Sequence, residues 1–331
     1  MSKIRVGING FGRIGRTFFK TVFDHEDIEV VAINDLAPAA TLAHLLKYDS
    51  IHGVFGQDIS TDQNNLIVGG SKVRISQFDS PENCDWSGID IVVESSGKFK
   101  DKASLQAHID AGAKKVILSV PPTDESIPMV VIGVNEDQLE GNESIISNAS
   151  CTTNNAAPMV KIIDELCGVE QAYITTVHSY TTDQSLHDQP HRDLRRARAA
   201  SQSIVPTTTG AAKALTKIFP DLADVIGGCG IRVPVPNGSM TDITFNVKKE
   251  VDIHMVNEAF KKAAQQDLNG ILDYTEDPIV SIDIVGNSHS CVFDSGMTSV
   301  IGRMVKIIGW YDNESGYSNR LADLIRLICK K

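Results

Sequence analysis

A glycine-rich turn near the N-terminus limits what this chain can fold into more than any other feature of its sequence. Residues 3–9 predict a strand, residues 13–23 predict a helix, and a Gly-x-Gly-x-x-Gly motif joins them. In this setting the first glycine permits a tight turn, the second lets the backbone approach a pyrophosphate, and the third allows close helix–strand packing. Free N–H groups at the helix start favour an anion there. The motif consists of Gly10, Phe11, Gly12, Arg13, Ile14 and Gly15.

A carboxylate after the next predicted strand points to the ligand of this turn. Residues 29–34 predict the strand, and Asp35 closes it, 20 positions after Gly15. A carboxylate at this place accepts hydrogen bonds from both ribose hydroxyls of an adenosine and repels a 2′-phosphate. The sequence therefore predicts a site for NAD rather than NADP. A tight turn without a ligand is the alternative.

The two halves of the chain differ in their pattern of elements. In the first half, apolar runs at 29–34, 89–94 and 115–120 alternate with helical patterns such as 101–111, which predicts parallel strands buried on both faces. In the second half fewer helices separate the strands, which predicts a mixed α+β unit. The strands expected there are 172–177, 231–235, 242–248 and 305–310, and the helices are 257–266 and 320–328.

We therefore expect an α/β fold with a Rossmann doubly wound parallel sheet, plus a second α+β catalytic domain with a mixed or antiparallel sheet. Residues 1–149, with a C-terminal helix at 315–331, would form the NAD-binding domain, and residues 150–314 would form the catalytic domain. The length of 331 residues fits about two domains.

The composition argues against several classes of protein. A net charge of −11 disfavours a dedicated surface for nucleic acid or for an anionic membrane. No apolar run approaches the ~20 residues that span a bilayer, and the N-terminus shows no signal-peptide pattern. The six cysteines are scattered without a CxxC pair, which predicts free thiols in a reducing cytoplasm and no metal site.

Cys151 is the strongest candidate for a nucleophile. It precedes a helical pattern at 156–166, so it is expected near a helix N-terminus, where the partial positive charge lowers the pKa of a thiol. The hydroxyls of Ser150 and Thr152 flank it and can donate to an anionic substrate group. A buried structural cysteine is the alternative, although a polar helix start fits that alternative poorly.

His178 is the candidate base. It ends the apolar run at 172–177 and precedes a polar loop, the kind of place where catalytic groups usually lie. His25, His108 and His254 fall in helical or surface patterns. Spacing alone favours His178 only modestly over the remaining histidines.

Three further segments can bind anions. Residues 192–198 contain four arginines, which indicates a solvated face, a nucleic-acid patch, or a local anion site or subunit contact. Residues 206–213 form a hydroxyl-rich turn before a helix, which is either a phosphate site or an ordinary helix cap. Arg232 opens an apolar strand and can bind a phosphate with two hydrogen bonds.

Together these segments resemble the phosphorylating, NAD-dependent glyceraldehyde-3-phosphate dehydrogenases over essentially the whole chain. The matching motifs occur in the family's order at 8–16, 150–154, 178–181, 195–200, 208–213 and 310–314, and the Ser-Cys-Thr-Thr-Asn motif is the most specific of them. The resemblance implies oxidation of glyceraldehyde 3-phosphate to 1,3-bisphosphoglycerate through a cysteine thioester, in a homotetramer.

The resemblance also implies a role for individual residues. Cys151 would attack the aldehyde and His178 would act as the base. Thr181 and Arg232 would hold the substrate phosphate, with Arg196 assisting an anion site. Inorganic phosphate would be held by Ser150, Thr152, Thr209 and Gly210. Asn313 would bind the nicotinamide carboxamide, with Tyr317 nearby and Ser119 in the cofactor groove.

Three positions depart from the family pattern. Asn155 stands where a second cysteine is usual, so one route to a disulfide is absent. Ser315 replaces a usual tryptophan beside Asn313, and Phe78 replaces a basic residue near the adenosine. Erythrose-4-phosphate dehydrogenase is the nearest alternative, followed by a non-catalytic protein that binds RNA or a partner. A cysteine hydrolase would leave the turn at Gly10–Gly15 unexplained.

Overall fold

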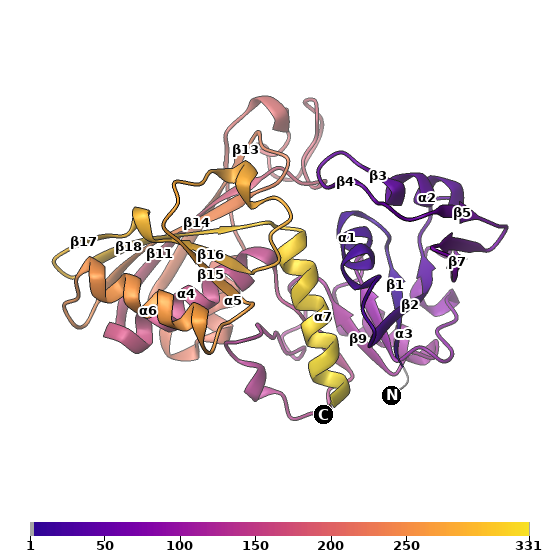
Figure 1. Cartoon of the computed structure of the whole chain (residues 1–331), viewed down its shortest axis with the longest axis horizontal. Helices are drawn as coiled ribbons and strands as arrows, with labels where there is room; N and C mark the ends of the chain where they lie inside the picture. Colours follow the sequence, from indigo (N-terminus) through magenta and orange to yellow (C-terminus); the bar gives the residue numbers. More distant parts are fainter. Residues whose placement is uncertain (1–2, 331) are drawn as a thin grey trace. The chain divides into compact units, whose positions relative to one another are not determined.

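A computed structural model describes residues 3–330, which form two compact units (Figure 1). The first unit comprises the chain up to Val130, Glu136–Ala149, and the end of the chain from Ser318. The second comprises Val131–Asn135 and Ser150–Tyr317. None of the helices within residues 3–330 is long and apolar enough to cross a membrane.

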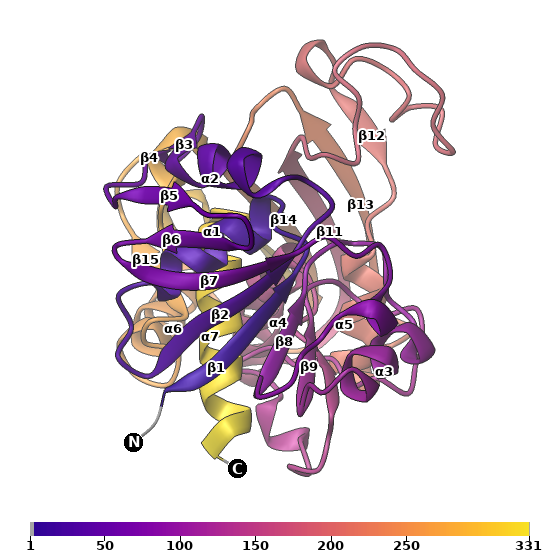
Figure 2. The same ribbon diagram turned by 90° about the vertical axis from the view of Figure 1, so that its right-hand side faces the viewer.

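The first unit contains a mostly parallel sheet in the order β10-β9-β8-β1-β2-β7-β6-β5, whose strands from β5 to β9 can be followed in Figure 2. Pairing is parallel from β10 to β7, whereas β6 and β5 are antiparallel additions. The strands are β1 (Ile4–Asn9), β2 (Ile28–Asn34), β5 (Ile59–Thr61), β6 (Asn65–Val68), β7 (Ser71–Ser76), β8 (Ile91–Glu94), β9 (Lys115–Leu118) and β10 (Ile145–Ser147); a separate pair is β3 (Tyr48–Asp49) and β4 (Gly53–Val54).

The helices of this unit are α1 (Arg13–Val22), α2 (Ala39–Lys47) and α3 (Lys102–Asp110), and α7 (Ser315–Lys330) contributes from Ser318 onward. The parallel sheet of the predicted Rossmann fold is confirmed. Sequence analysis missed α2 and the antiparallel strands β5 and β6. The last helix begins at Ser315, as the expected range 315–331 predicts, and the narrower pattern at 320–328 covers only part of it. Asp312 supports this start by accepting hydrogen bonds from the N–H groups of Glu314 and Ser315.

The second unit contains a mixed sheet in the order β12-β13-β11-β14-β18-β16-β15, with β17 beside β18. Helices α4, α5 and α6 lie on one face of it (Figure 1). This confirms the predicted α+β class. The strands are β11 (Val169–Ser179), β12 (Val205–Thr207), β13 (Ile226–Val233), β14 (Ser239–Val247), β15 (Leu272–Thr275), β16 (Cys291–Asp294), β17 (Ser299–Ile301) and β18 (Met304–Tyr311); the helices are α4 (Cys151–Cys167), α5 (Ala211–Ile218) and α6 (Ile253–Gln265).

Several predicted bounds in this unit differ from those in the structure, among them the starts of one strand and one helix. The strand expected at 231–235 begins at Ile226, because its first half is glycine-rich and lacks the β-branched side chains that indicate a strand. The helix expected at 257–266 begins at Ile253, where Asp252 caps it by accepting a hydrogen bond from the N–H of Met255.

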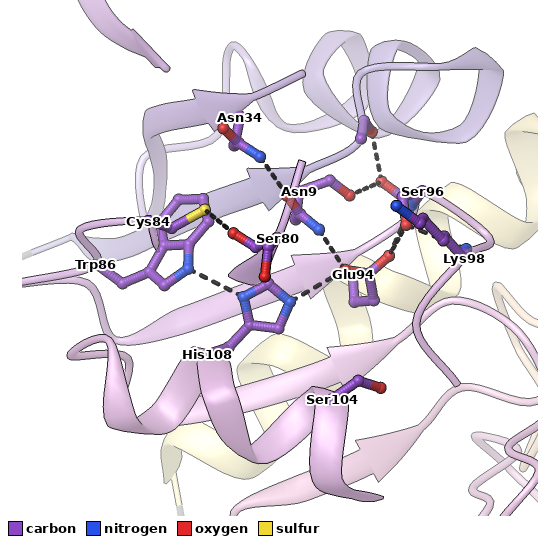
Figure 3. Close-up of polar contacts among 12 residues, drawn as sticks. Asn9, Asn34, Ser80, Cys84, Trp86, Glu94, Ser96, Lys98, Ser104 and His108 are labelled. Carbon is purple, nitrogen blue, oxygen red and sulfur yellow. Dashed lines mark hydrogen bonds and ion pairs between the residues drawn. The ribbon is translucent and has the colours of Figure 1, made fainter. Parts of the chain in front are cut away.

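Three polar residues form a row across the C-terminal ends of the central parallel strands. Asn9 of β1 is in register with Asn34 of β2 on one side and with Glu94 of β8 on the other. Asn34 Nδ2 donates to Asn9 Oδ1 at 2.8 Å, and Asn9 Nδ2 donates to Glu94 Oε2 (Figure 3). All three are buried, so these hydrogen bonds tie the ends of the strands together.

Glu94 is a buried carboxylate that is satisfied by neutral donors. Trp86 Nε1 can only donate, and it donates to His108 Nδ1 at 3.0 Å, so the proton of neutral His108 is on Nε2. This Nε2 lies 3.0 Å from Glu94 Oε2 and donates to it, while the N–H and hydroxyl of Ser96 donate to Oε1 (Figure 3). His108, which the sequence pattern placed on an ordinary helix, is therefore fully buried in a polar network.

Replacing Glu94 by Gln should destabilise the first unit by about 1–3 kcal/mol, because the new amide group turns a donor toward donors in a buried site. Urea unfolding measures this loss. The matched control is Glu29→Gln on the adjacent strand β2, where the side chain is exposed and the expected change is below about 0.5 kcal/mol. Equal effects of the two substitutions would contradict this account of the network.

Candidate active site

A groove of about 270 Å³ lies at the C-terminal ends of β1, β2 and β8. Ligands of open α/β sheets bind at such strand ends. The groove is lined by Asn9, Gly10, Gly12, Asn34, Asp35, Leu36, Phe78, Asp79, Ser95, Ser96, Lys98 and Phe99.

The glycines of the turn behave as the sequence predicted. Gly10 has a φ of +91°, and a Cβ there would lie 2.5 Å from the backbone of Ser96. A Cβ on Gly15 would lie 2.4 Å from the carbonyl oxygen of Gly10, which is the close packing of helix on strand. Gly12 faces open space and precedes α1, whose N-terminus has no side-chain cap. The N–H groups of this turn can therefore bind a pyrophosphate.

Both carboxylate oxygens of Asp35 are held by backbone N–H groups. Its Oδ2 accepts from the N–H of Phe11 at 2.7 Å, and its Oδ1 accepts from the N–H of Ala37 at 2.9 Å. Each oxygen keeps a further lone pair for a hydroxyl donor. An anion-binding turn beside this carboxylate fits a dinucleotide, and the carboxylate disfavours a 2′-phosphate.

Several residues near the turn do not line the groove. The guanidinium of Arg13 pairs with Asp49 at 2.9 Å, and Phe11, Ile14 and Ser119 lie outside the lining. Conversely, the lining contains Lys98, whose Nζ donates to the carbonyl oxygen of Asp79 at 3.3 Å. Sequence reasoning missed this cation, although its place just after β8 was a usable signal.

In the second unit Cys151 begins helix α4. Ser150 caps the helix, its Oγ accepting from the N–H of Thr153 at 3.1 Å. Ala149 has a φ of 54°, the left-handed conformation that residues other than glycine rarely adopt. Such backbone strain clusters at functional sites, and here it lies two residues before Cys151, next to the capping residue Ser150.

His178 lies beside the thiol. It occupies the C-terminal end of β11, and its Nε2 is 3.5 Å from Sγ of Cys151. Its Nδ1 is 2.7 Å from the carbonyl oxygen of Ser179, to which Arg232 Nη1 also donates at 2.9 Å. Arg232 Nη1, which can only donate, also lies 2.7 Å from Nδ1. In the tautomer whose Nδ1 proton is directed at the Ser179 carbonyl, Nε2 is the acceptor that faces the thiol.

Burial favours the neutral forms of both His178 and Cys151. Burial, and secondarily Arg232 with Nη1 2.7 Å from Nδ1, lowers the pKa of His178 to about 3. Burial also raises the pKa of the Cys151 thiol, although Arg232 and Thr152 act in the opposite direction. The lowered thiol pKa that the sequence predicted is therefore wrong, because desolvation outweighs the helix N-terminus and the nearby cation.

Asn313 lies near the same end of β11. Its Oδ1 accepts from the hydroxyls of Ser179 at 2.8 Å and Ser239 at 3.1 Å, which fixes the orientation of its amide. Tyr317 follows in the first turn of α7 and is buried. Ser315 takes part in the start of this helix, its N–H donating to Asp312 at 2.8 Å.

The predicted anion-binding residues lie on several segments of the second unit. Thr152 is buried, and its hydroxyl is 2.9 Å from the hydroxyl of Tyr311, a residue that sequence reasoning missed. Arg196 Nε donates to Thr207 at 3.0 Å, so it lies beside the segment that leads into Thr209 and Gly210. Thr181 is half-buried in the loop that follows β11, and Asn155 donates weakly to the carbonyls of Ser290 and Trp310, both at 3.3 Å.

A dinucleotide groove and a cysteine–histidine pair in one chain define a thiol-dependent oxidoreductase that uses NAD. Two family models match the sequence: "Glyceraldehyde 3-phosphate dehydrogenase, NAD binding domain" over residues 4–102, and "Glyceraldehyde 3-phosphate dehydrogenase, C-terminal domain" over residues 150–313. The chain belongs to the glyceraldehyde-3-phosphate dehydrogenase family.

Curated relatives match over nearly their whole length. Glyceraldehyde-3-phosphate dehydrogenase of Mycobacterium avium is 51% identical over 336 residues, with 99% of each chain covered. Glyceraldehyde-3-phosphate dehydrogenase 2 of Streptomyces avermitilis is 53% identical, with 97% of each chain covered. Glyceraldehyde-3-phosphate dehydrogenase 1 of Bacillus subtilis is 50% identical, with 99% of each chain covered.

Two glycine substitutions should separate cofactor binding from folding. Gly12→Ala should leave stability nearly unchanged, because its Cβ meets nothing within 4 Å, but it should weaken NAD binding by about 1–3 kcal/mol by filling space beside the turn. Gly15→Ala should instead lower the free energy of unfolding by a similar amount, because its Cβ overlaps the Gly10 carbonyl. Calorimetric NAD titration and urea unfolding give the two quantities; the reverse pattern would contradict the geometry.

Proposed function

We propose that this chain oxidises D-glyceraldehyde 3-phosphate with NAD and inorganic phosphate to 1,3-bisphosphoglycerate, a step of glycolysis and gluconeogenesis. The observation that carries the proposal is the 3.5 Å approach of Cys151 Sγ to His178 Nε2 in a chain that also has a dinucleotide groove. A thiol can hold an acyl group as a thioester, which keeps the energy of aldehyde oxidation for transfer to phosphate.

The proposed chemistry uses His178 twice as a base. Its Nε2 takes the proton of Cys151 as Sγ attacks the aldehyde carbon, and it returns this proton to the oxygen of the hemithioacetal. It then removes the hydroxyl proton while the carbon loses hydride, which leaves a thioester on Cys151. NAD, when bound, supplies the hydride acceptor. Inorganic phosphate attacks the thioester carbon, the thiolate leaves, and His178 returns the proton to it.

The anion-binding roles follow the family pattern. We assign the substrate phosphate to Thr181 and Arg232, whose guanidinium lies against the catalytic histidine. We assign inorganic phosphate to the start of α4 and the turn before α5, with Arg196 assisting. The residues of this second group are Ser150, Thr152, Thr209 and Gly210.

The cofactor roles rest on the groove and on the amide of Asn313. The turn from Gly10 to Gly15 would hold the pyrophosphate, and Asp35 the ribose of the adenosine, with Ser119 nearby. Asn313 would bind the nicotinamide carboxamide, beside Tyr317. In this assignment residues 1–149 and 315–331 form the NAD-binding domain, and residues 150–314 form the catalytic domain, to which Asn313 belongs.

We further propose that the enzyme is a homotetramer of the cytoplasm. Tyr173 and Met304 are exposed apolar side chains of the second sheet, and they support association with further copies. The six cysteines are all unpaired, as in proteins of a reducing compartment.

Cys151→Ala should abolish phosphate-dependent NADH production, lowering kcat by at least about a thousandfold, because no other group can form the thioester. The matched control is Cys229→Ala, which removes another partly buried thiol outside the proposed catalytic site, on β13. We expect this control to retain activity. A Cys151→Ala enzyme that produced NADH at the normal rate would refute the mechanism.

Assays of two aldehydes, with and without phosphate, distinguish the proposed function from its nearest alternative. We expect kcat/KM for glyceraldehyde 3-phosphate to exceed that for erythrose 4-phosphate, and we expect sustained turnover only with phosphate, because phosphate must release the acyl group. A preference for erythrose 4-phosphate, or rates independent of phosphate, would favour the non-phosphorylating enzyme. Failure to bind NAD would favour a non-catalytic binding protein.

A further inference from the structure

Each nitrogen of the Arg196 guanidinium contacts a group of its own chain. Its Nε donates to the Thr207 hydroxyl at 3.0 Å and its Nη2 to the carbonyl oxygen of Thr208 at 3.3 Å. Its Nη1 forms a short ion pair with the carboxylate of Asp183. The Arg196 side chain is only 14% exposed, whereas that of Asp183 is 48% exposed. The carboxylate thus covers the arginine from the solvent side.

A second carboxylate nearby has a different function. Asp193 Oδ2 accepts from the Thr207 hydroxyl at 2.7 Å and lies 3.7 Å from Arg196 Nε. It therefore holds the threonine that orients the guanidinium, and it leaves Nη1 to Asp183. Asp183 is the more exposed of these two acids.

Asp183 also contributes to the charge of the catalytic site. The positive charge of Arg196 lowers the pKa values of His178 and Arg232, and the negative charge of Asp183 acts in the opposite direction on Arg232. Asp183 is thus a negative charge beside a group of cations that we assign to two phosphates. A carboxylate and a phosphate both bind a guanidinium through paired oxygen acceptors, and they repel each other.

We propose that Asp183 sets the affinity of the inorganic-phosphate site: its carboxylate occupies Arg196 in the absence of an anion, and phosphate must displace it. This inference rests on the proposed role of Arg196 in holding inorganic phosphate. Asp183 is a specificity-determining residue in this scheme and takes no part in the bond-making steps. Its carboxylate pairs with Nη1 of Arg196, a cation whose charge lowers the pKa of His178.

The alternative is that the ion pair only holds the loop after β11 in place. The two possibilities predict opposite signs. If Asp183 competes with phosphate, removing its charge strengthens phosphate binding, whereas if it only supports the loop, removing its charge misplaces Arg196 and weakens phosphate binding.

The test uses the full-length enzyme with NAD bound and inorganic phosphate as the probe. Asp183→Asn should lower the KM and the Kd for phosphate by about fivefold, which corresponds to the free energy of a partly exposed ion pair. The Kd is measured by calorimetry without aldehyde. The KM for NAD should not change. Asp183→Glu keeps the charge and should stay within about twofold of the wild type.

The matched control is Asp188→Asn. Asp188 lies in the same loop and pairs with Arg198 at 2.9 Å, so this variant removes the same charge without touching Arg196. It should leave the phosphate constants unchanged. Thermal unfolding of each variant checks that the fold is intact, and if Asp183→Asn unfolds early, Asp183→Ser provides the same loss of charge.

The possible failures can be told apart. If wild-type enzyme neither binds phosphate nor needs it for turnover, the proposed function fails. If wild-type enzyme needs phosphate but the charge-removing variants of Asp183 bind it equally well or more weakly, the role of Asp183 is overturned and the proposed function stands. Equal strengthening by Asp188→Asn would also overturn it, because a general change of charge would then explain the result.

Discussion

The cofactor groove depends on one buried carboxylate. The carboxylate of Glu94 is buried inside the first unit, where such a group is stable only if its oxygens accept several hydrogen bonds. Its donors come from β1, from α3 and from the loop after β8. The hydrogen bonds to Glu94 therefore hold in place the strand ends beside Gly10 and Asp35. A Cβ on Gly10 would clash with the backbone of Ser96, in the same loop after β8.

The thiol site of the second unit depends on two element ends. The cap by Ser150 starts α4 at Cys151, and the end of β11 presents His178 to the sulfur. Arg232 approaches the far nitrogen of the imidazole, so one cation links the base to a proposed anion site. If Arg232 binds the substrate phosphate as proposed, the negative charge of the phosphate would offset that of the guanidinium and raise the pKa of His178.

Much of this was predictable because local rules carried it. The glycine motif specifies a strand–turn–helix, and the structure has these elements at Ile4–Asn9 and Arg13–Val22. Other features were not predictable, because they are contacts between distant segments. Nothing in the pattern around His108 shows that it meets Trp86 and Glu94, and nothing around Arg196 shows that Asp183 covers it. The thiol pKa was predicted in the wrong direction because burial is a property of the packed unit.

The sequence by itself determined the class of fold, the dinucleotide-binding turn and the candidate nucleophile at a helix start, because each rests on residues close together in the chain. Only the tertiary structure decided which charges those groups meet. It showed that Cys151 and His178 are adjacent, that desolvation favours the neutral form of both, with Arg232 adding to this effect only at His178, and that Arg196 is engaged by a carboxylate. Electrostatic environment depends on groups brought together by folding, and a linear pattern does not contain it.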